Sequence, residues 1–131
     1  MRISLIAVFL TLSCSAAVAD PCGGKLPKAG TNFQGQVRYV GDGDSLCVGN
    51  TANSNEWIEV RIADFYAPEL NAAGGRDAKA ALERIAMGKL AMCTAGKRSY
   101  DRVVATCSIN GRSVADWMKA ADVPEGGRGR L

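Results

Sequence analysis

Residues 40–45 read Val40-Gly41-Asp42-Gly43-Asp44-Ser45, and a strand-like run follows that leads to Val60-Arg61-Ile62 and then Ala67-Pro68-Glu69. Because Asp and Gly tolerate the positive φ angles of tight turns, the first segment predicts a hairpin turn between two strands. The same stretch places clustered carboxylates at the turn, a guanidinium on a strand and a further carboxylate behind a proline. Such a set suits a metal ion that faces a phosphate. A simple turn and a metal site are both compatible with these residues.

The hydrophobic pattern on either side of this turn predicts a mainly β domain with helices, of the α+β class. Alternating or short apolar runs favour strands over residues 34–40, 45–48, 57–65, 90–93 and 103–109, with loops over 49–55 and 94–102. Apolar residues at helical spacing, followed by Gly88, predict a helix between the third and fourth strands. Ser113 and Asp116 resemble a capping box, which predicts a second helix before Pro124. This order is that of a five-stranded OB-fold barrel with a C-terminal helix.

The N-terminal residues are typical of a secretory signal peptide. Arg2 precedes an apolar run over residues 3–12, and Ala17-Val18-Ala19 forms a small-residue cleavage site. The sequence therefore predicts a signal peptide over residues 1–19 and a single exported domain over residues 20–131, periplasmic or extracellular and without a membrane anchor after cleavage. The Gly- and Arg-rich tail over residues 125–131 is expected to be loose.

Four cysteines remain after cleavage, at Cys22, Cys47, Cys93 and Cys107. An even number in an exported domain indicates disulfides, and four cysteines allow three connectivities. We expect Cys93 to bond Cys107, because both lie on strands that can pair as a hairpin, and this leaves Cys22 for Cys47. A zinc site is the competing interpretation, but the chain has no C-x-x-C pair and no histidine to build one.

The complete absence of histidine excludes whole classes of site. Ser-His-Asp and Cys-His nucleophile systems, histidine general bases and His-ligated zinc all need an imidazole. Catalysis would have to use carboxylates, Arg, Lys, Tyr or a metal held by oxygen ligands. The net charge of +3, which falls by one when Arg2 leaves with the signal peptide, is too mild to indicate a nucleic-acid partner by itself. A local basic patch would have to bind any phosphate.

Several short motifs, taken in order, resemble the staphylococcal nuclease (thermonuclease) family over residues 36–123. Besides the segments quoted above, they are Gly75-Arg76-Asp77-Ala78-Lys79-Ala80, Tyr100-Asp101-Arg102 and Asn110-Gly111-Arg112-Ser113-Val114. Each motif is weak, whereas the ordered set is specific. The resemblance implies an OB-fold endonuclease, a hydrolase that cleaves DNA and RNA phosphodiesters with one calcium ion.

The resemblance also implies roles for individual residues. Asp44 would ligate calcium with Asp42 as its supporting neighbour, Glu69 would activate the attacking water, and Arg61 and Arg102 would be the catalytic arginines. Tyr100 would contact a substrate phosphate. These roles agree with the chemistry, because a phosphodiester gains negative charge in the transition state, and guanidinium groups and a hard cation stabilise that charge.

One departure from the family pattern puts the metal site in doubt. The family reads Asp-Thr-Pro-Glu or Asp-Ala-Pro-Glu where this chain has Tyr66-Ala67-Pro68-Glu69, so the second carboxylate ligand is missing. Asp64 is a candidate substitute, although a displacement of two residues along a strand amounts to about 6–7 Å. We therefore expect calcium to bind weakly.

Three functions remain open at this point. The first is an exported, disulfide-bonded thermonuclease-like monomer that acts on DNA or RNA. The second is a catalytically impaired OB-fold module that binds nucleic acid or another anionic polymer. The third is a small exported domain with a structural or protein-binding role. The Tyr66 position discriminates the first function from the other two. The family's last helix, which carries another active-site tyrosine, is expected to be shortened or absent here.

Overall fold

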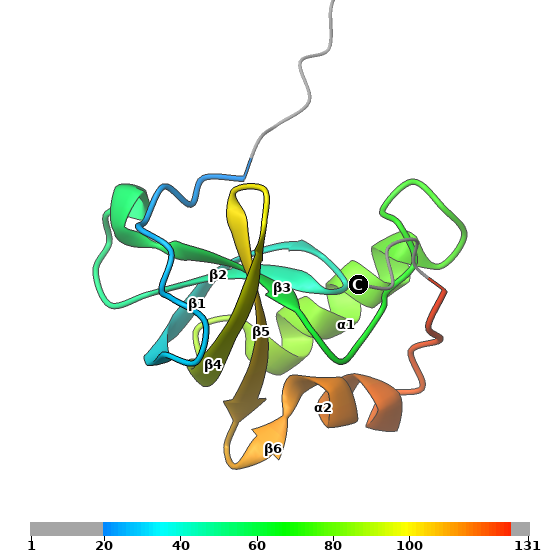
Figure 1. Cartoon of the computed structure of the whole chain (residues 1–131). Helices are drawn as coiled ribbons and strands as arrows, with labels where there is room; N and C mark the ends of the chain where they lie inside the picture. Colours follow the sequence, from blue (N-terminus) through cyan, green and yellow to red (C-terminus); the bar gives the residue numbers. More distant parts are fainter. Residues whose placement is uncertain (1–19, 127–131) are drawn as a thin grey trace, which may run out of the picture.

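The computed structural model describes residues 20–126, in which six strands and two α-helices form one packed unit (Figure 1). The predicted signal peptide over residues 1–19 lies outside the described residues. The elements in chain order are β1 (Asn32–Asp42), β2 (Ser45–Gly49), a 3-10 turn η1 (Ser54–Glu56), β3 (Ile58–Ile62), α1 (Gly75–Ala86), β4 (Leu90–Ser99), β5 (Arg102–Ile109), β6 (Arg112–Ser113) and α2 (Val114–Ala120). The predicted α+β class is therefore confirmed.

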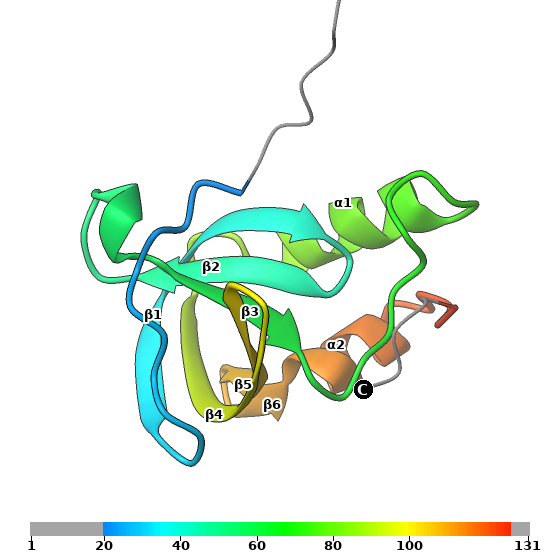
Figure 2. The ribbon, with the colours of Figure 1, turned by 45° about the horizontal axis from the view of Figure 1, so that its top comes forward.

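The strands form one sheet in the order β3-β2-β1-β4-β5-β6. Neighbours in this order pair antiparallel, and β3 also pairs with β5 in parallel, so that Val60 lies beside Val103 and Arg61 beside Val104. This extra pairing joins β5 back to β3, and hydrogen bonding runs in a ring through β3, β2, β1, β4 and β5. Figure 2 shows how strongly the long strands β1 and β4 bend to allow it.

The interior of the unit is built from apolar side chains of the strands and of one stripe on α1. The stripe of α1 contains Ala78, Ala81, Leu82 and Ala86, all buried at helical spacing. The largest fully buried side chains include Phe65, Leu46, Ile62, Leu82, Ile109 and Met118. Helix α1 contacts β1, and α2 contacts β5, β6 and α1. The β1–β2 turn is thereby held between α1 and the segment that follows β3.

The local signals for helix ends and turns are confirmed. The Ser113 hydroxyl accepts a hydrogen bond of 3.0 Å from the backbone N–H of Asp116, as a capping box requires. Gly88 has φ +75° one residue after the C-cap of α1. Asn110 and Gly111 both have positive φ, the geometry of a tight turn between β5 and β6.

The predicted loop over residues 94–102 is wrong. Strand β4 continues to Ser99 and β5 begins at Arg102, so only Tyr100 and Asp101 form the connecting turn. The polar residues of this hairpin are exposed, and cross-strand pairing rather than hydrophobic alternation holds them in the sheet. The prediction also missed β6, whose two residues are too few to carry a pattern, and extended the third strand beyond Ile62.

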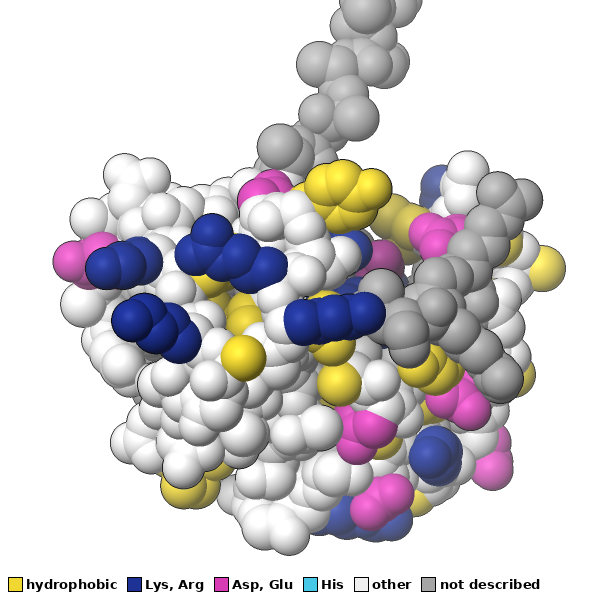
Figure 3. Space-filling model, viewed as in Figure 1, with side chains coloured by type: hydrophobic (Ala, Val, Ile, Leu, Met, Phe, Trp, Pro, Cys, Tyr) yellow, Lys and Arg dark blue, Asp and Glu magenta, His cyan; other side chains and the backbone are white. Residues whose placement is uncertain are grey.

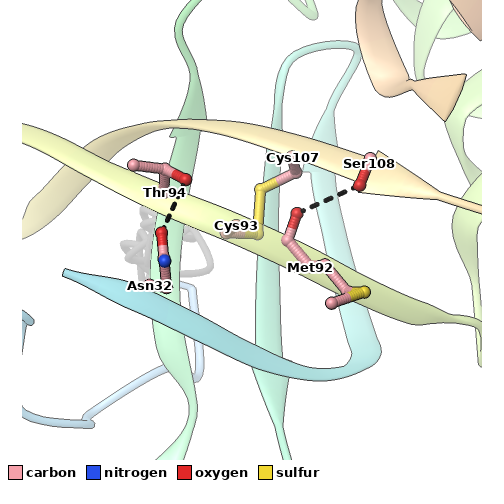
Figure 4. The surroundings of a disulfide bond; sticks show 6 residues. All are labelled: Asn32, Met92, Cys93, Thr94, Cys107 and Ser108. Atoms are coloured by element: carbon pink, nitrogen blue, oxygen red, sulfur yellow. Dashed lines mark hydrogen bonds between the residues drawn. A yellow bond between two sulfur atoms is a disulfide. The ribbon is translucent and has the colours of Figure 1, made fainter. Parts of the chain in front are cut away.

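Both expected disulfides are present, Cys22–Cys47 and Cys93–Cys107. Cys93 and Cys107 face each other across β4 and β5, as Figure 4 shows, between a hydrogen bond from Ser108 to the Met92 carbonyl and one from Thr94 to Asn32. Within residues 20–126, helices are too short or too polar to cross a membrane. Two disulfides indicate an oxidising compartment.

Candidate functional site

The β1–β2 turn is packed so closely that only glycine fits at its centre. A Cβ atom at Gly43 would lie 2.5 Å from the Ala67 Cβ and 2.6 Å from the Ala78 Cβ. Real Cβ contacts are longer, so the turn lies directly on α1 and on the segment after β3. The Asp42 carboxylate accepts a hydrogen bond of 3.1 Å from the Asp44 backbone N–H, which fixes the two acidic residues relative to each other.

Asp44 lies under the surface with only 6% of its area exposed. Its Oδ2 atom accepts a hydrogen bond of 2.8 Å from the Ala67 backbone N–H and lies 3.2 Å from the Arg61 Nη1 atom. The turn, β3 and the segment after β3 therefore meet at one carboxylate oxygen. Buried charges are stable only when paired and hydrogen-bonded in this way.

Arg61 is equally buried and is fixed by backbone carbonyls. Its Nη1 atom donates hydrogen bonds to the carbonyls of Ile62, at 2.6 Å, and Phe65, at 3.1 Å. These bonds explain why β3 ends at Ile62, since the chain curls around the guanidinium instead of continuing the sheet. The Tyr66 ring covers the guanidinium at 5.4 Å from its centroid. Tyr66 therefore lies at the site, where its ring packs on the guanidinium cation of Arg61. It does not take the place of the missing metal ligand.

The pKa values of the two acidic residues of the turn, Asp42 and Asp44, are shifted in opposite directions. Burial, the nearby charge of Asp42 and a hydrogen bond with Asp42 raise the pKa of Asp44 to about 7. Burial alone would also raise the pKa of Asp42, but hydrogen bonds from Asp44 and Ser45 and the charge of Arg61 hold it below its usual value. The two carboxyls thus share a proton at moderately acidic pH. A divalent cation between them would replace that proton.

Glu69 lies in the same cleft as Asp42. The cleft has a volume of about 630 Å³ and is lined on one side by these two carboxylates and on the other by α1. The backbone of Glu69 approaches the start of α1 so closely that residue 75 has to be glycine. The sequence-predicted general base is thereby anchored beside the β1–β2 turn.

Arg102 and Arg61 face the same side of the sheet. Val104 pairs with Arg61, and Arg102 lies two residues before Val104 on β5, so its side chain projects to the same side. Arg102 is half-buried. Tyr100 lies at the tip of the β4–β5 turn, 95% exposed and with φ 59°, where it is open to a partner.

Asp64 is exposed, and among the described residues no hydrogen bond or ion pair joins it to Asp44. In the range 20–126, three His, Cys, Asp or Glu side chains do not come together in a group that could hold a metal ion. The residues present therefore fit calcium only in part, through the carboxylates of Asp42 and Asp44 and with Glu69 nearby in the cleft. Such a donor set suits a hard cation bound weakly.

Sequence reasoning missed Glu59, which lies two residues before Arg61 on the same face of β3 and is only 6% exposed. Burial, a hydrogen bond with Asp20 and the charges of Asp101 and Asp20 raise its pKa to about 7, against the opposing charge of Arg102. The signal that could have found it is the alternation of Glu59, Arg61 and the apolar residues between them. Asp20 of the lead-in segment hydrogen-bonds with Glu59, a contact that leaves no periodic signal in the sequence.

Figure 3 shows Lys and Arg side chains spread over the strands on one side of the molecule, with acidic side chains more frequent toward the helices.

A scan of family models finds none that matches the chain, and a search of curated proteins finds no significant match.

Proposed function

We propose that the chain is an exported, OB-fold phosphodiesterase of the thermonuclease type, a divalent-metal-dependent endonuclease acting on DNA or RNA. The observation that carries the proposal is the buried Asp44–Arg61 pair, which lies beside Asp42, and Asp42 in turn lines a cleft together with Glu69. Burial and neighbouring like charges that shift pKa values are typical of catalytic sites, although structural ion-pair networks produce such shifts too. The oxygen-only donors agree with calcium, and the two disulfides agree with export to an oxidising compartment.

In the proposed mechanism, a cation held by Asp42 and Asp44 would supply positive charge at the phosphate. Arg61 is positioned through Nη1, and a phosphate oxygen would have to pass the Tyr66 ring to reach its remaining N–H groups. Arg102, on the same side of the sheet, binds a second oxygen. Their planar forks match phosphate geometry and stabilise the charge that develops in the transition state. Glu69 orients a water molecule in the cleft and accepts its proton at the carboxylate. Tyr100 contacts a neighbouring phosphate.

A digestion assay tests this function. Plasmid DNA and RNA are incubated with the mature protein at increasing calcium concentrations and with a chelator. Cleavage should require the metal, and Arg102→Lys should lower turnover by about 10²-fold, the scale of a lost electrostatic donor. Arg112→Lys is the matched control, because Arg112 packs on the Trp117 ring at 4.8 Å from its centroid, on β6. Equal rates in Arg102→Lys and the wild type would contradict the role of Arg102.

A second candidate is a binding module for nucleic acid or another anionic polymer, without catalysis. The Asp44–Arg61 pair favours it, since Arg61 already supplies a counter-charge for Asp44, and Tyr66 covers the guanidinium where the family has a carboxylate. Metal-independent binding of single-stranded DNA without cleavage at any calcium concentration would support the module and exclude the nuclease.

A further inference from the structure

The far wall of the cleft beside Asp42 and Glu69 carries two cationic side chains that no role above uses. This wall is one face of α1, formed by Arg76, Lys79, Ala80 and Glu83, which recur at helical spacing. The cleft therefore has an acidic wall at the candidate catalytic residues and a partly basic wall opposite it.

Arg76 and Lys79 are available to a ligand. Within the described part of the chain, Arg76 forms no ion pair, and Lys79 forms an ion pair only with Glu83, at a distance of 3.9 Å. Exposed pairs at this spacing on a helix are weak and are readily exchanged for another anion. Arg76 lies in the first turn of a 12-residue helix, where the helix dipole adds positive potential, and Lys79 lies one turn further along the same face.

The size of the cleft indicates what kind of molecule could carry the anion that binds Arg76 and Lys79. A volume of about 630 Å³ is enough for a nucleotide unit. A strand whose scissile phosphate faces Asp44 and Arg61 would pass Glu69 and enter the cleft, so that its next phosphate would face α1. A neutral or cationic ligand would leave Arg76 without a counter-charge.

We propose that Arg76 and Lys79 form a binding site for a backbone phosphate of a single nucleic-acid strand, next to the phosphate at Asp44 and Arg61. The proposal rests on the proposed function for its substrate class. In this proposal, one face of α1 is part of the surface that binds the strand. Arg76 and Lys79 increase the affinity for the strand and take no part in the cleavage step. Their removal should therefore raise KM and leave kcat unchanged.

Binding without cleavage provides the test. The affinity of the mature protein for a fluorescein-labelled oligothymidine of about 10 nucleotides, a length within OB-fold site sizes, is measured by anisotropy in chelator at several salt concentrations. Arg76→Gln and Lys79→Gln should each raise Kd several-fold and reduce the slope of log K against log salt by about 0.7, one lost single-strand phosphate contact. Glu83→Gln should lower Kd, because it releases Lys79.

Arg84→Gln is the matched control, since Arg84 belongs to the same helix but faces a different hollow, beside Val123 and Pro124. It removes the same charge and should leave Kd unchanged. Equal weakening by Arg84→Gln and Arg76→Gln, unchanged binding in Arg76→Gln and Lys79→Gln, or no oligonucleotide binding by the wild type would each overturn the inference. Weaker binding in Arg76→Gln without any cleavage by the wild type would support the inference and refute only the nuclease.

Discussion

The carboxylate of Asp44 and the guanidinium of Arg61 form a buried ion pair, with Oδ2 and Nη1 at 3.2 Å and both side chains less than a tenth exposed. The pair joins the β1–β2 turn to the end of β3, and the Ala67 N–H also donates a hydrogen bond to the Asp44 carboxylate. The same two residues are the candidate metal ligand and the candidate catalytic arginine. The fold and the proposed function therefore both involve this contact.

Removal of one partner should destabilise the domain strongly. Arg61→Gln leaves Asp44 buried without its counter-charge, and we expect a loss of about 3–5 kcal/mol in the free energy of unfolding. Urea denaturation measures it. The double variant Arg61→Gln, Asp44→Asn should recover part of the loss, because no unpaired charge remains in it. A loss in Arg61→Gln below about 1 kcal/mol, the level of an exposed pair, would show that the pair contributes little to stability, because Asp44 can take up a proton when its counter-charge is removed.

Burial of Arg61 is the part of the site that the sequence could not predict. Alternation around Val60 and Ile62 predicts a strand and places Arg61 on the outer face, where arginine is ordinarily exposed. In the structure, the chain after β3 curls back over that face, and Ile62 and Phe65 offer their carbonyls to the guanidinium. Such a return path leaves no periodic signal.

Local chemistry made other parts predictable. The turn at residues 41–44, the cap at Ser113 and the turn at Asn110 and Gly111 depend on neighbours in sequence, and all three are confirmed. The β4–β5 hairpin was missed because its polar residues are held by pairing across strands. Residues 125 and 126, predicted as part of a loose tail, bond to the backbone of Tyr66 at 3.2 and 3.0 Å, a contact between distant segments. Residues 127–131 lie outside the described range.

Substitution of Tyr66 tests the metal site. Tyr66→Asp would place a third carboxylate near Asp44, and calcium affinity rises steeply with ligand charge. We expect wild-type binding on the order of millimolar and at least about tenfold tighter binding in the variant, measured by calorimetry. Tyr66→Asn is the uncharged control and should not tighten binding.

Asp64→Asn completes this test. Because Asp64 is exposed, its loss should leave calcium affinity unchanged. If Asp64→Asn abolished binding while Tyr66→Asp had no effect, Asp64 would be the substitute ligand that the sequence suggests.

The Cys22–Cys47 bond should stabilise the domain by fixing the lead-in segment over β2 and β3. It closes a loop with a sequence separation of 25 residues, so Cys22→Ser, Cys47→Ser should cost about 3–4 kcal/mol in the chain-entropy estimate. The backbone N–H groups of Gly23 and Gly24 bond to the carbonyls of Ser54 and Trp57 at 3.0 and 2.8 Å. These two amides should exchange faster with solvent in the variant, as measured by hydrogen exchange. Unchanged protection at both would contradict this role.

Glu59→Gln should remove part of the pH dependence of stability. The pKa of Glu59 is raised to about 7 in the folded domain, against about 4.3 when unfolded, so its contribution is complete below pH about 4.3 and is lost as the pH rises toward 7. Asp44 titrates in the same pH range, so its part of the pH dependence of stability remains in the variant. The Tm of Glu59→Gln should equal that of the wild type at pH 4 and exceed it by about 4–8 °C at pH 8. Glu83→Gln, the exposed control, should show no such gain. Equal losses of Tm in Glu59→Gln and the wild type between these pH values would mean that folded Glu59 does not retain its proton.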